Sequence, residues 1–261
     1  LFALLILNCK IDHGLEPVSS KIMGKVIFHG DTPRYTDEVR VAVIKTFPPS
    51  DIAELLFSER ISQFVDSVDY EIYLPPGTYD MVAAIWKESD EPWNLSDIIG
   101  LYGGFFIGDQ LVPTFQSVTL EDNHTILNGI DIETNLNRVN RDSKIEGTVT
   151  FEGSWPDDTG VIGVGAFTEI PTQGDYIDYY LKNVDIDYTV PIFVDSADYQ
   201  LRVHSTDTLK YIAVLWINTT YDLTTIQDIG FYPDPGDSTQ PGIIMAPPNA
   251  TLSGVDITVH F

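Results

Sequence analysis

Apolar and polar residues alternate along much of this chain, in short runs separated by clusters of Gly, Pro, Asn and Asp. Tyr70, Ile72 and Leu74 fall on one side of an extended segment, and residues 79–85 alternate in the same way. Alternation with a period of two is typical of a strand with one buried face. The Pro-Pro-Gly-Thr sequence at residues 75–78 suits a tight turn, so the pattern predicts a β-hairpin over residues 70–85.

The same alternation predicts further strands at residues 22–28, 39–44, 129–132, 145–151, 161–167, 199–203, 211–216 and 254–259. Helical spacing is scarce. Residues 50–61 are the one good candidate, with Asp51 as a possible N-cap, although the segment could also be a loop that packs its apolar side. Many short strands at regular spacing predict an all-β protein of antiparallel β-sandwiches, with about seven strands in each.

The chain contains its own sequence pattern twice. Residues 21–30 return as residues 144–153, and the Gly-Ile-Asp-Ile sequence at 129–132 returns as Gly-Val-Asp-Ile at 254–257. A repeat of this length is the size of a self-sufficient domain rather than of a solenoid unit. We therefore expect two tandem sandwiches, at residues 21–139 and 140–261, with one core each.

What recurs between the copies is Gly, Tyr, Trp and alternating apolar residues, which are the residues of packing. Trp86 and Trp216 occupy one position of the repeat within alternating strands and are expected in the two cores. The acidic turns and the other tryptophans do not recur. A specific activity is therefore expected where the two copies differ.

The opening Ile-x-Gly-x-Val-x-Phe-x-Gly of residues 22–30, together with Tyr-x-Ile-x-Leu-Pro-Pro-Gly-Thr-Tyr-Asp-x-Val-Ala at residues 70–83, resembles the carboxypeptidase regulatory-like, or transthyretin-like, domain. The resemblance covers most of each copy and is better in the first. It implies a β-sandwich that is a non-catalytic part of a secreted or outer-membrane protein, with a role in stability, spacing or interaction. A resemblance in fold carries no specific activity.

The N-terminus indicates export. Residues 1–7 are uniformly apolar, Cys9 is the single cysteine, and the chain becomes polar from Lys10 onward. This resembles the end of a bacterial lipoprotein signal, in which the cysteine is lipidated. Residues 1–9 are then a truncated signal and residues 10–20 a tether, which predicts a lipid-anchored protein at the outer membrane or cell surface. The alternatives are a cleaved secretory peptide, a buried strand, or a strand donated to another copy.

The composition limits the classes of molecule that the protein is expected to bind. The 39 Asp and Glu residues outnumber the 14 Lys and Arg residues, and the formal net charge is −25. Such a charge repels nucleic acid, so we expect no nucleic-acid partner. The remaining candidates are other surface proteins, polysaccharide, or copies of the chain itself through pairing of sheet edges.

No hydrolase, kinase or nucleotide-binding motif is present, and the five histidines lack zinc-site spacing, so the chain is not expected to be an enzyme. No cofactor is expected apart from Ca²⁺, for which Asp185, Asp187, Asp234 and Asp237 are the candidates because they place hard oxygen ligands on turns. They do not match a known calcium loop, and solvated acidic turns are the favoured explanation.

Trp93 and Trp155 each stand next to a proline in an expected loop, where an indole ring could stack on a sugar. They are the candidate ligand-binding residues. The sequence therefore predicts an exported β-sandwich module with a binding or structural role, and the alternatives are a carbohydrate-binding accessory protein and a subunit of an extracellular assembly.

Overall fold

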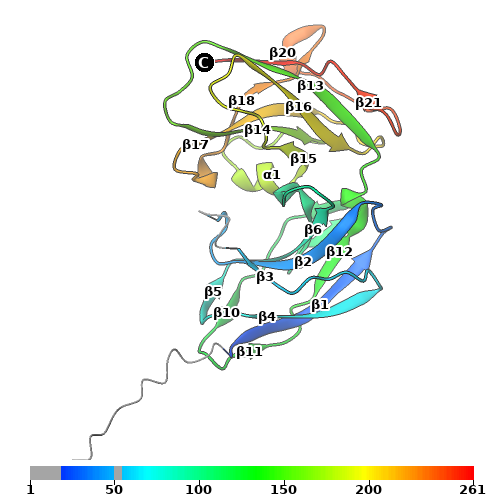
Figure 1. Cartoon of the computed structure of the whole chain (residues 1–261), viewed down its shortest axis with the longest axis vertical. Helices are drawn as coiled ribbons and strands as arrows, with labels where there is room; N and C mark the ends of the chain where they lie inside the picture. Colours follow the sequence, from blue (N-terminus) through cyan, green and yellow to red (C-terminus); the bar gives the residue numbers. More distant parts are fainter. Residues whose placement is uncertain (1–18, 50–54) are drawn as a thin grey trace, which may run out of the picture.

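The computed structural model of this protein describes residues 19–49 and 55–261, and these residues form mainly β-strands (Figure 1). The strands of the first repeat are β1 (Lys21–His29), β2 (Thr36–Ile44), β3 (Leu56–Phe57), β4 (Ser67–Tyr73), β5 (Gly77–Tyr79), β6 (Met81–Glu88), β7 (Ile98–Leu101), β8 (Phe105–Ile107), β9 (Gln110–Val112), β10 (Val118–Leu120), β11 (Ile126–Leu127) and β12 (Ile132–Asn135). Those of the second are β13 (Ser143–Glu152), β14 (Thr159–Phe167), β15 (Asn183–Asp187), β16 (Ser196–Val203), β17 (Tyr211–Asn218), β18 (Gln227–Phe231), β19 (Pro233–Asp234), β20 (Asp237–Pro241), β21 (Thr251–Leu252) and β22 (Ile257–His260). The helix α1 (Tyr176–Leu181) and the 3₁₀ turns η2 (Leu95–Asp97), η3 (Leu136–Val139) and η4 (Leu223–Thr225) complete the fold.

Each repeat is a sandwich of two sheets, which confirms the predicted fold class. The outer sheet of the first repeat contains β4, β1, β11 and β12, and its inner sheet has the order β3-β2-β6-β7. The second repeat matches it, with β16, β13, β21 and β22 outside and the order β15-β14-β17-β18 inside. The sheets lie one above another along the long axis of the molecule (Figure 1).

Most neighbouring strands run antiparallel, but the first and last strands of each repeat run parallel. β1 pairs in parallel with β11 and β12, and β13 does so with β21 and β22. The last strands of each repeat therefore lie beside its first strand.

The repeated glycines explain how these parallel strands meet. A Cβ added to Gly24 would lie 2.1 Å from the carbonyl oxygen of Ile130, and one added to Gly147 would lie 2.0 Å from that of Val255. The hydroxyl of Tyr70 donates to the same Ile130 oxygen at 2.6 Å. In the second repeat the hydroxyl of Tyr199 donates to the Val255 oxygen, also at 2.6 Å. Close backbone approach and a buried tyrosine therefore close both sandwiches in the same way.

The predicted hairpin over residues 70–85 is wrong. β4 belongs to the outer sheet, where it pairs with β1, whereas β6 belongs to the inner sheet between β2 and β7. The Pro-Pro-Gly-Thr segment carries the chain from one sheet to the other, and the intervening β5 pairs with β10. The apolar pattern located both strands, but such a pattern does not specify which strand each one pairs with.

The helix predicted at residues 50–61 is not supported in its described part. Residues 50–54, including Asp51, lie outside the described residues, while Leu56 and Phe57 form β3 and Ile61 bridges to Val39. The side chain of Phe57 packs against buried apolar residues, as expected from the alternative prediction of a loop that packs its apolar side. In the second repeat α1, which was not predicted, precedes the matching strand β15, with Asp175 as its N-cap.

Residues 19–49 and 55–261 form three apolar cores, one more than the single core expected for each copy. One core lies within each sandwich, and Trp86 and Trp216 are buried in them as predicted. The third core contains side chains from both repeats, including Ile44, Ala83 and Ile85 from β2 and β6. Its partners from the second repeat are Phe167, Tyr211, Ala213, Leu215 and Ile217. The two inner sheets are therefore packed against each other and buried on both faces.

No helix among residues 19–49 and 55–261 is both long and apolar enough to cross a bilayer.

Candidate functional site

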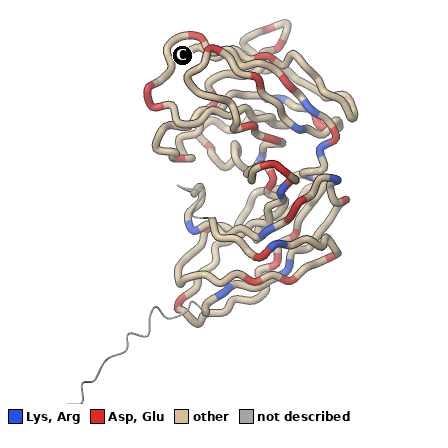
Figure 2. The backbone as a smooth tube through the Cα atoms, in the orientation of Figure 1, with Lys and Arg blue, Asp and Glu red and all other residues tan. Residues whose placement is uncertain are grey.

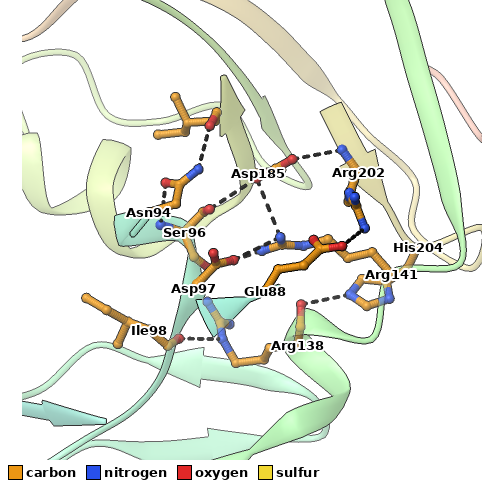
Figure 3. Close-up of polar contacts among 11 residues, drawn as sticks. Glu88, Asn94, Ser96, Asp97, Ile98, Arg138, Arg141, Asp185, Arg202 and His204 are labelled. Atoms are coloured by element: carbon orange, nitrogen blue, oxygen red, sulfur yellow. Dashed lines mark hydrogen bonds and ion pairs between the residues drawn. The ribbon is translucent and has the colours of Figure 1, made fainter. Parts of the chain in front are cut away.

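A buried polar network joins the two sandwiches at one end of the shared core (Figure 3). Its centre is Arg141, in the linker between η3 and β13, whose side chain is only 4% exposed. Its Nη1 contacts the carboxylates of Asp97 at 3.0 Å and Asp185 at 3.5 Å, and its Nη2 donates to the carbonyl of Ser96 at 3.1 Å. The linker is thus fixed to η2 of the first repeat and to β15 of the second.

The turn η2 is itself positioned by its cap. The Oδ1 of Asn94 accepts a hydrogen bond from the amide of Ser96, as an N-cap does. Its Nδ2 donates to the carbonyl of Ile186 in the second repeat at 2.7 Å, and the Ser96 hydroxyl donates to Asp185 at 3.1 Å. The side chains of this short turn therefore make two hydrogen bonds with the second sandwich, and the Asp97 carboxylate contacts the linker arginine.

A second ion pair crosses the joint beside the first. Glu88, at the end of β6, contacts Arg202 of β16 at 2.5 Å. The amide of Arg202 donates to the Oδ2 of Asp185 at 2.8 Å, so this pair and the Arg141 cluster share one carboxylate. Arg138 donates to the carbonyl of Ile98 at 3.3 Å, and its own carbonyl lies 3.1 Å from the Nε2 of His204.

Burial dominates the electrostatics of the joint. It raises the pKa of Asp97 from its usual value to about 6, against the opposing effect of Arg141. Burial likewise raises the pKa of Glu88, and it lowers that of Arg138 to about 10, with repulsion from Arg141 adding to the effect. Burial also lowers the pKa of Arg141, but Asp185 and Asp97 together outweigh this and raise it. The arginine therefore stays charged, and burial moves the pKa of Asp97 toward neutral pH.

The four calcium candidates are used to cap backbone amides. Asp185 belongs to the joint, and Asp187 accepts from the amides of Thr189 and Gln200. Asp234 accepts from the amides of Gly236 and Asp237, in the turn between β19 and β20. Among the described residues no group of three or more His, Cys, Asp or Glu side chains is placed to hold a metal ion. Local capping, typical of Asp in turns, accounts for their positions.

Trp93 and Trp155 lie in different repeats and are not brought together. The Trp93 ring stacks on Phe57, with 5.5 Å between centroids, at the margin of the shared core. The Trp155 indole donates to the carbonyl of Val194 at 3.1 Å, and its ring packs against Phe151 at 4.5 Å. Both rings are partly buried, so their role in ligand binding stays a prediction. Cys9, the predicted lipidation site, lies outside the described residues.

Of the joint residues, only Asp185 was singled out from the sequence, as a calcium candidate and not as part of a joint. Arg138 and Arg141 stand three residues apart at the predicted boundary between the copies, in a chain with only 14 Lys and Arg residues. Two of these few cations so close to the boundary between the copies are a detectable signal. Figure 2 shows Asp and Glu distributed over both sandwiches, with Lys and Arg close to Asp and Glu where the two repeats meet.

No protein-family model matches the chain, and no curated protein matches it. Similar solved structures include a leucine-rich repeat protein from Bacteroides thetaiotaomicron, 8% identical, which covers 92% of this chain with a TM-score of 0.35. This chain spans only 26% of that protein. The tip fimbrial protein Mfa3 from Porphyromonas gingivalis is 8% identical over 88% of this chain and 91% of its own, with a TM-score of 0.27. The major pilin from Streptococcus pyogenes is 9% identical over 92% and 96%, with a TM-score of 0.21.

Proposed function

We propose that this protein is a non-enzymatic, exported module whose two sandwiches form one rigid body that presents binding surfaces to other molecules. The observation that carries the proposal is the joint, where both inner sheets share an apolar core and Arg141 is buried between carboxylates from both repeats. Such a joint holds surfaces on the two repeats at a constant separation. This is the property that a spacing or binding module requires.

The rigidity follows from the kind of contact. Domains linked by small polar interfaces generally move relative to each other. Here large side chains such as Phe167 and Leu215 are fully buried at the shared core, and separating the repeats would expose them to water. Separation would also remove the Asp97 carboxylate of the first repeat from the guanidinium of Arg141, which would leave buried charges without their partners.

Export and lipid anchoring at Cys9 are part of the proposal and are supported by the apolar run of residues 1–7 followed by the cysteine. The transthyretin-like resemblance is compatible with the sandwich fold and stays a prediction. Mass spectrometry of the protein from its natural membrane tests the anchor. A diacylglyceryl modification on an N-terminal Cys9 is expected, and an intact Leu1 would exclude it.

The experiment that tests the rigid body is calorimetric unfolding of the Arg141→Ala variant. Wild-type protein is expected to unfold in one transition, because the repeats share a core. The variant leaves Asp97 and Asp185 without their cation, so we expect its free energy of unfolding to be lower by about 3–5 kcal/mol. Lys144→Ala is the control, since Lys144 is only part-buried and its Nζ donates to Gln200 at the exterior. Two independent transitions in the wild type would contradict the proposal.

A further inference from the structure

The strand β4 forms one edge of the outer sheet of the first repeat. The backbone amides of successive β4 residues point alternately toward β1 and away from it. The amide of Phe28 donates to the carbonyl of Asp66, and that of Leu74 donates to Ser20, so even-numbered positions face β1. In an antiparallel ladder the intervening residues then point away from the partner strand. The amides of Asp69, Glu71 and Tyr73 therefore point out of the sheet.

The second repeat shows what such an edge looks like when it is capped. Glu71 and Tyr73 lie opposite Met23 and Lys21 of β1, just as Gln200 and Arg202 lie opposite Glu146 and Lys144 of β13. The amide of Gln200 donates to Asp187 at 3.2 Å, and the amide of Arg202 donates to Asp185 at 2.8 Å. Two carboxylates from β15 thus satisfy the outward edge of β16.

Among the described residues of the first repeat, no carboxylate caps β4 in this way. Val41 and Val164 hold the same place in the two inner sheets, because each lies two residues beyond the partner of the repeated tryptophan. Asp187 lies opposite Val164, and the residue in the matching place beside Val41 is Ser58. The Ser58 hydroxyl accepts a hydrogen bond from the Val41 amide and donates one to the carbonyl of Glu59, so it does not cap β4. Leu56, at the position of Asp185, has no acceptor in its side chain.

A groove lies where the cap is absent. It has a volume of ≈ 350 Å³ and is lined by residues 58–63 on one side and residues 68–71 of β4 on the other. Within residues 19–49 and 55–261, no hydrogen-bond partner is found for the amides of Glu71 and Tyr73. An uncapped edge beside a groove is the setting in which an extended peptide can add to a sheet as a further strand.

The charges around the groove favour a cationic occupant. Glu59 and Asp69 are exposed along it, whereas Glu71 already contacts Lys21 of β1 at 2.6 Å. The cation among its lining residues, Arg60, contacts Asp37 at 2.8 Å, so it does not neutralise the other two carboxylates. A second copy would bring a net charge of −25 to an acidic edge, which disfavours pairing of this chain with itself. A strand that carries Lys or Arg would instead be attracted to this acidic edge.

We propose that the open edge of β4 binds an extended, Lys- or Arg-bearing segment of another protein, which adds to the outer sheet as a fifth strand. Its backbone would pair with the outward amides and carbonyls of Asp69, Glu71 and Tyr73, and its cations would lie beside Glu59 and the edge carboxylates. This inference rests on the binding role proposed above and names the class of partner.

The test uses the intact chain and a fluorescein-labelled, end-blocked octapeptide of alternating Lys and Val, with a Glu-Val octapeptide as the matched control. Anisotropy is expected to show saturable binding of the basic peptide and at least tenfold weaker binding of the acidic one. Amide spectra of the ¹⁵N-labelled protein are expected to shift at Glu71 and Tyr73, and not at Gln200 and Arg202, which are already capped.

Two variants separate edge pairing from simple charge attraction. Glu71→Pro removes an outward amide without breaking the ladder with β1, because proline is tolerated where the N–H faces away from the sheet. Glu71→Gln removes the same charge but keeps the amide. We expect Glu71→Pro to weaken binding at least tenfold and Glu71→Gln about two- to threefold, in line with the small contribution of one exposed charge.

The third variant transfers the cap from one repeat to the other. Leu56→Asp places a carboxylate at the position of Asp185, and Leu56 is 38% exposed, so the site can accept a polar side chain. Binding is expected to fall at least tenfold while the circular dichroism spectrum and unfolding temperature stay those of a folded protein. Equal binding of both peptides, wild-type binding by both Glu71→Pro and Leu56→Asp, or self-association through β4 in place of peptide binding would each overturn the proposal. One-step unfolding would still hold in those cases, so failure here is distinct from failure of the rigid-body function.

Discussion

Individual residues that recur in both copies perform the same task twice. Gly24 and Gly147 allow the segments just before β12 and β22 to approach closely, and the hydroxyls of Tyr70 and Tyr199 donate to the carbonyls of Ile130 and Val255 in those segments. Trp86 donates its indole N–H to Thr36, and Trp216 donates to Thr159. The repeat thus preserves a set of hydrogen bonds as well as apolar positions, which explains why these polar-tipped aromatics persist.

At this scale we predict that Gly24→Ala and Gly147→Ala each destabilise the protein by about 3 kcal/mol, at the upper end of overpacking costs. The new methyl group would meet a backbone oxygen, which cannot move as the tip of a flexible side chain can. Urea unfolding measures the loss.

Gly236→Ala is the matched control, because its nearest neighbour is the Asp234 carboxylate at 3.2 Å in an exposed turn. A change below about 0.5 kcal/mol is expected there, as for ordinary surface substitutions. Equal effects at all three glycines would contradict the account of close backbone approach.

At the scale of elements, the turn η2 and the strand β15 place Asp97 in a joint whose stability depends on pH. The pKa of Asp97 in the folded protein, about 6, is above its ordinary value of 3.8. The folded state therefore binds a proton that the unfolded state lacks between these values, and its stability rises as pH falls from 7 toward 4.5. Glu88, whose pKa burial also raises, acts in the same direction.

We therefore predict that stability increases on mild acidification, with Asp97 contributing about 2 kcal/mol between pH 7 and pH 4.5. Below pH 4 we expect the stability to fall as the pH falls. Asp109, Asp142 and Asp178 have lowered pKa values in the folded protein and lose favourable contacts when they are protonated. Denaturant unfolding at pH 7, 6, 5 and 3 measures the profile.

Asp97→Asn is the control, since it removes the titrating group while Asp185 still neutralises Arg141. The rise in stability between pH 7 and 5 should become smaller in this variant. An identical rise in both proteins would assign the effect to the relief of overall negative charge instead.

Across the whole molecule, the shared core makes the repeats depend on each other. β6 and β17 present Ala83 and Leu215 to the shared core and Ala84 and Val214 to the cores of their own sandwiches. Such a strand has no exposed face, so a separated repeat would present an apolar surface to water. Large exposed apolar patches generally promote association.

We predict that residues 140–261 expressed alone self-associate or precipitate, although they contain a complete sandwich. Analytical ultracentrifugation measures the state, with the intact chain as the reference. Replacing Leu215 by Lys in the fragment should restore solubility by breaking up the exposed face. A monomeric, stable fragment without this change would show that the joint is dispensable.

Part of the architecture could be predicted from local pattern. The alternation of residues 22–28 and 145–151 identified two strands correctly, and the duplication indicated two sandwiches. The continuous apolar runs at 81–86 and 211–217 carried a signal that was missed, because strands buried on both faces lose their alternation. The hairpin was wrong since a proline-rich turn reverses the chain equally well within a sheet or between two sheets.

The sequence by itself determined the strands, the duplication and the glycine and tyrosine positions, because each of these follows from residues close together in the chain or from a direct repeat. Only the tertiary structure decided that the two inner sheets share a core, that Arg141 lies between Asp97 and Asp185, and that β16 is capped while β4 is open. These features depend on which faces of distant segments meet. Alternation states that a face is apolar, whereas packing alone determines what covers it.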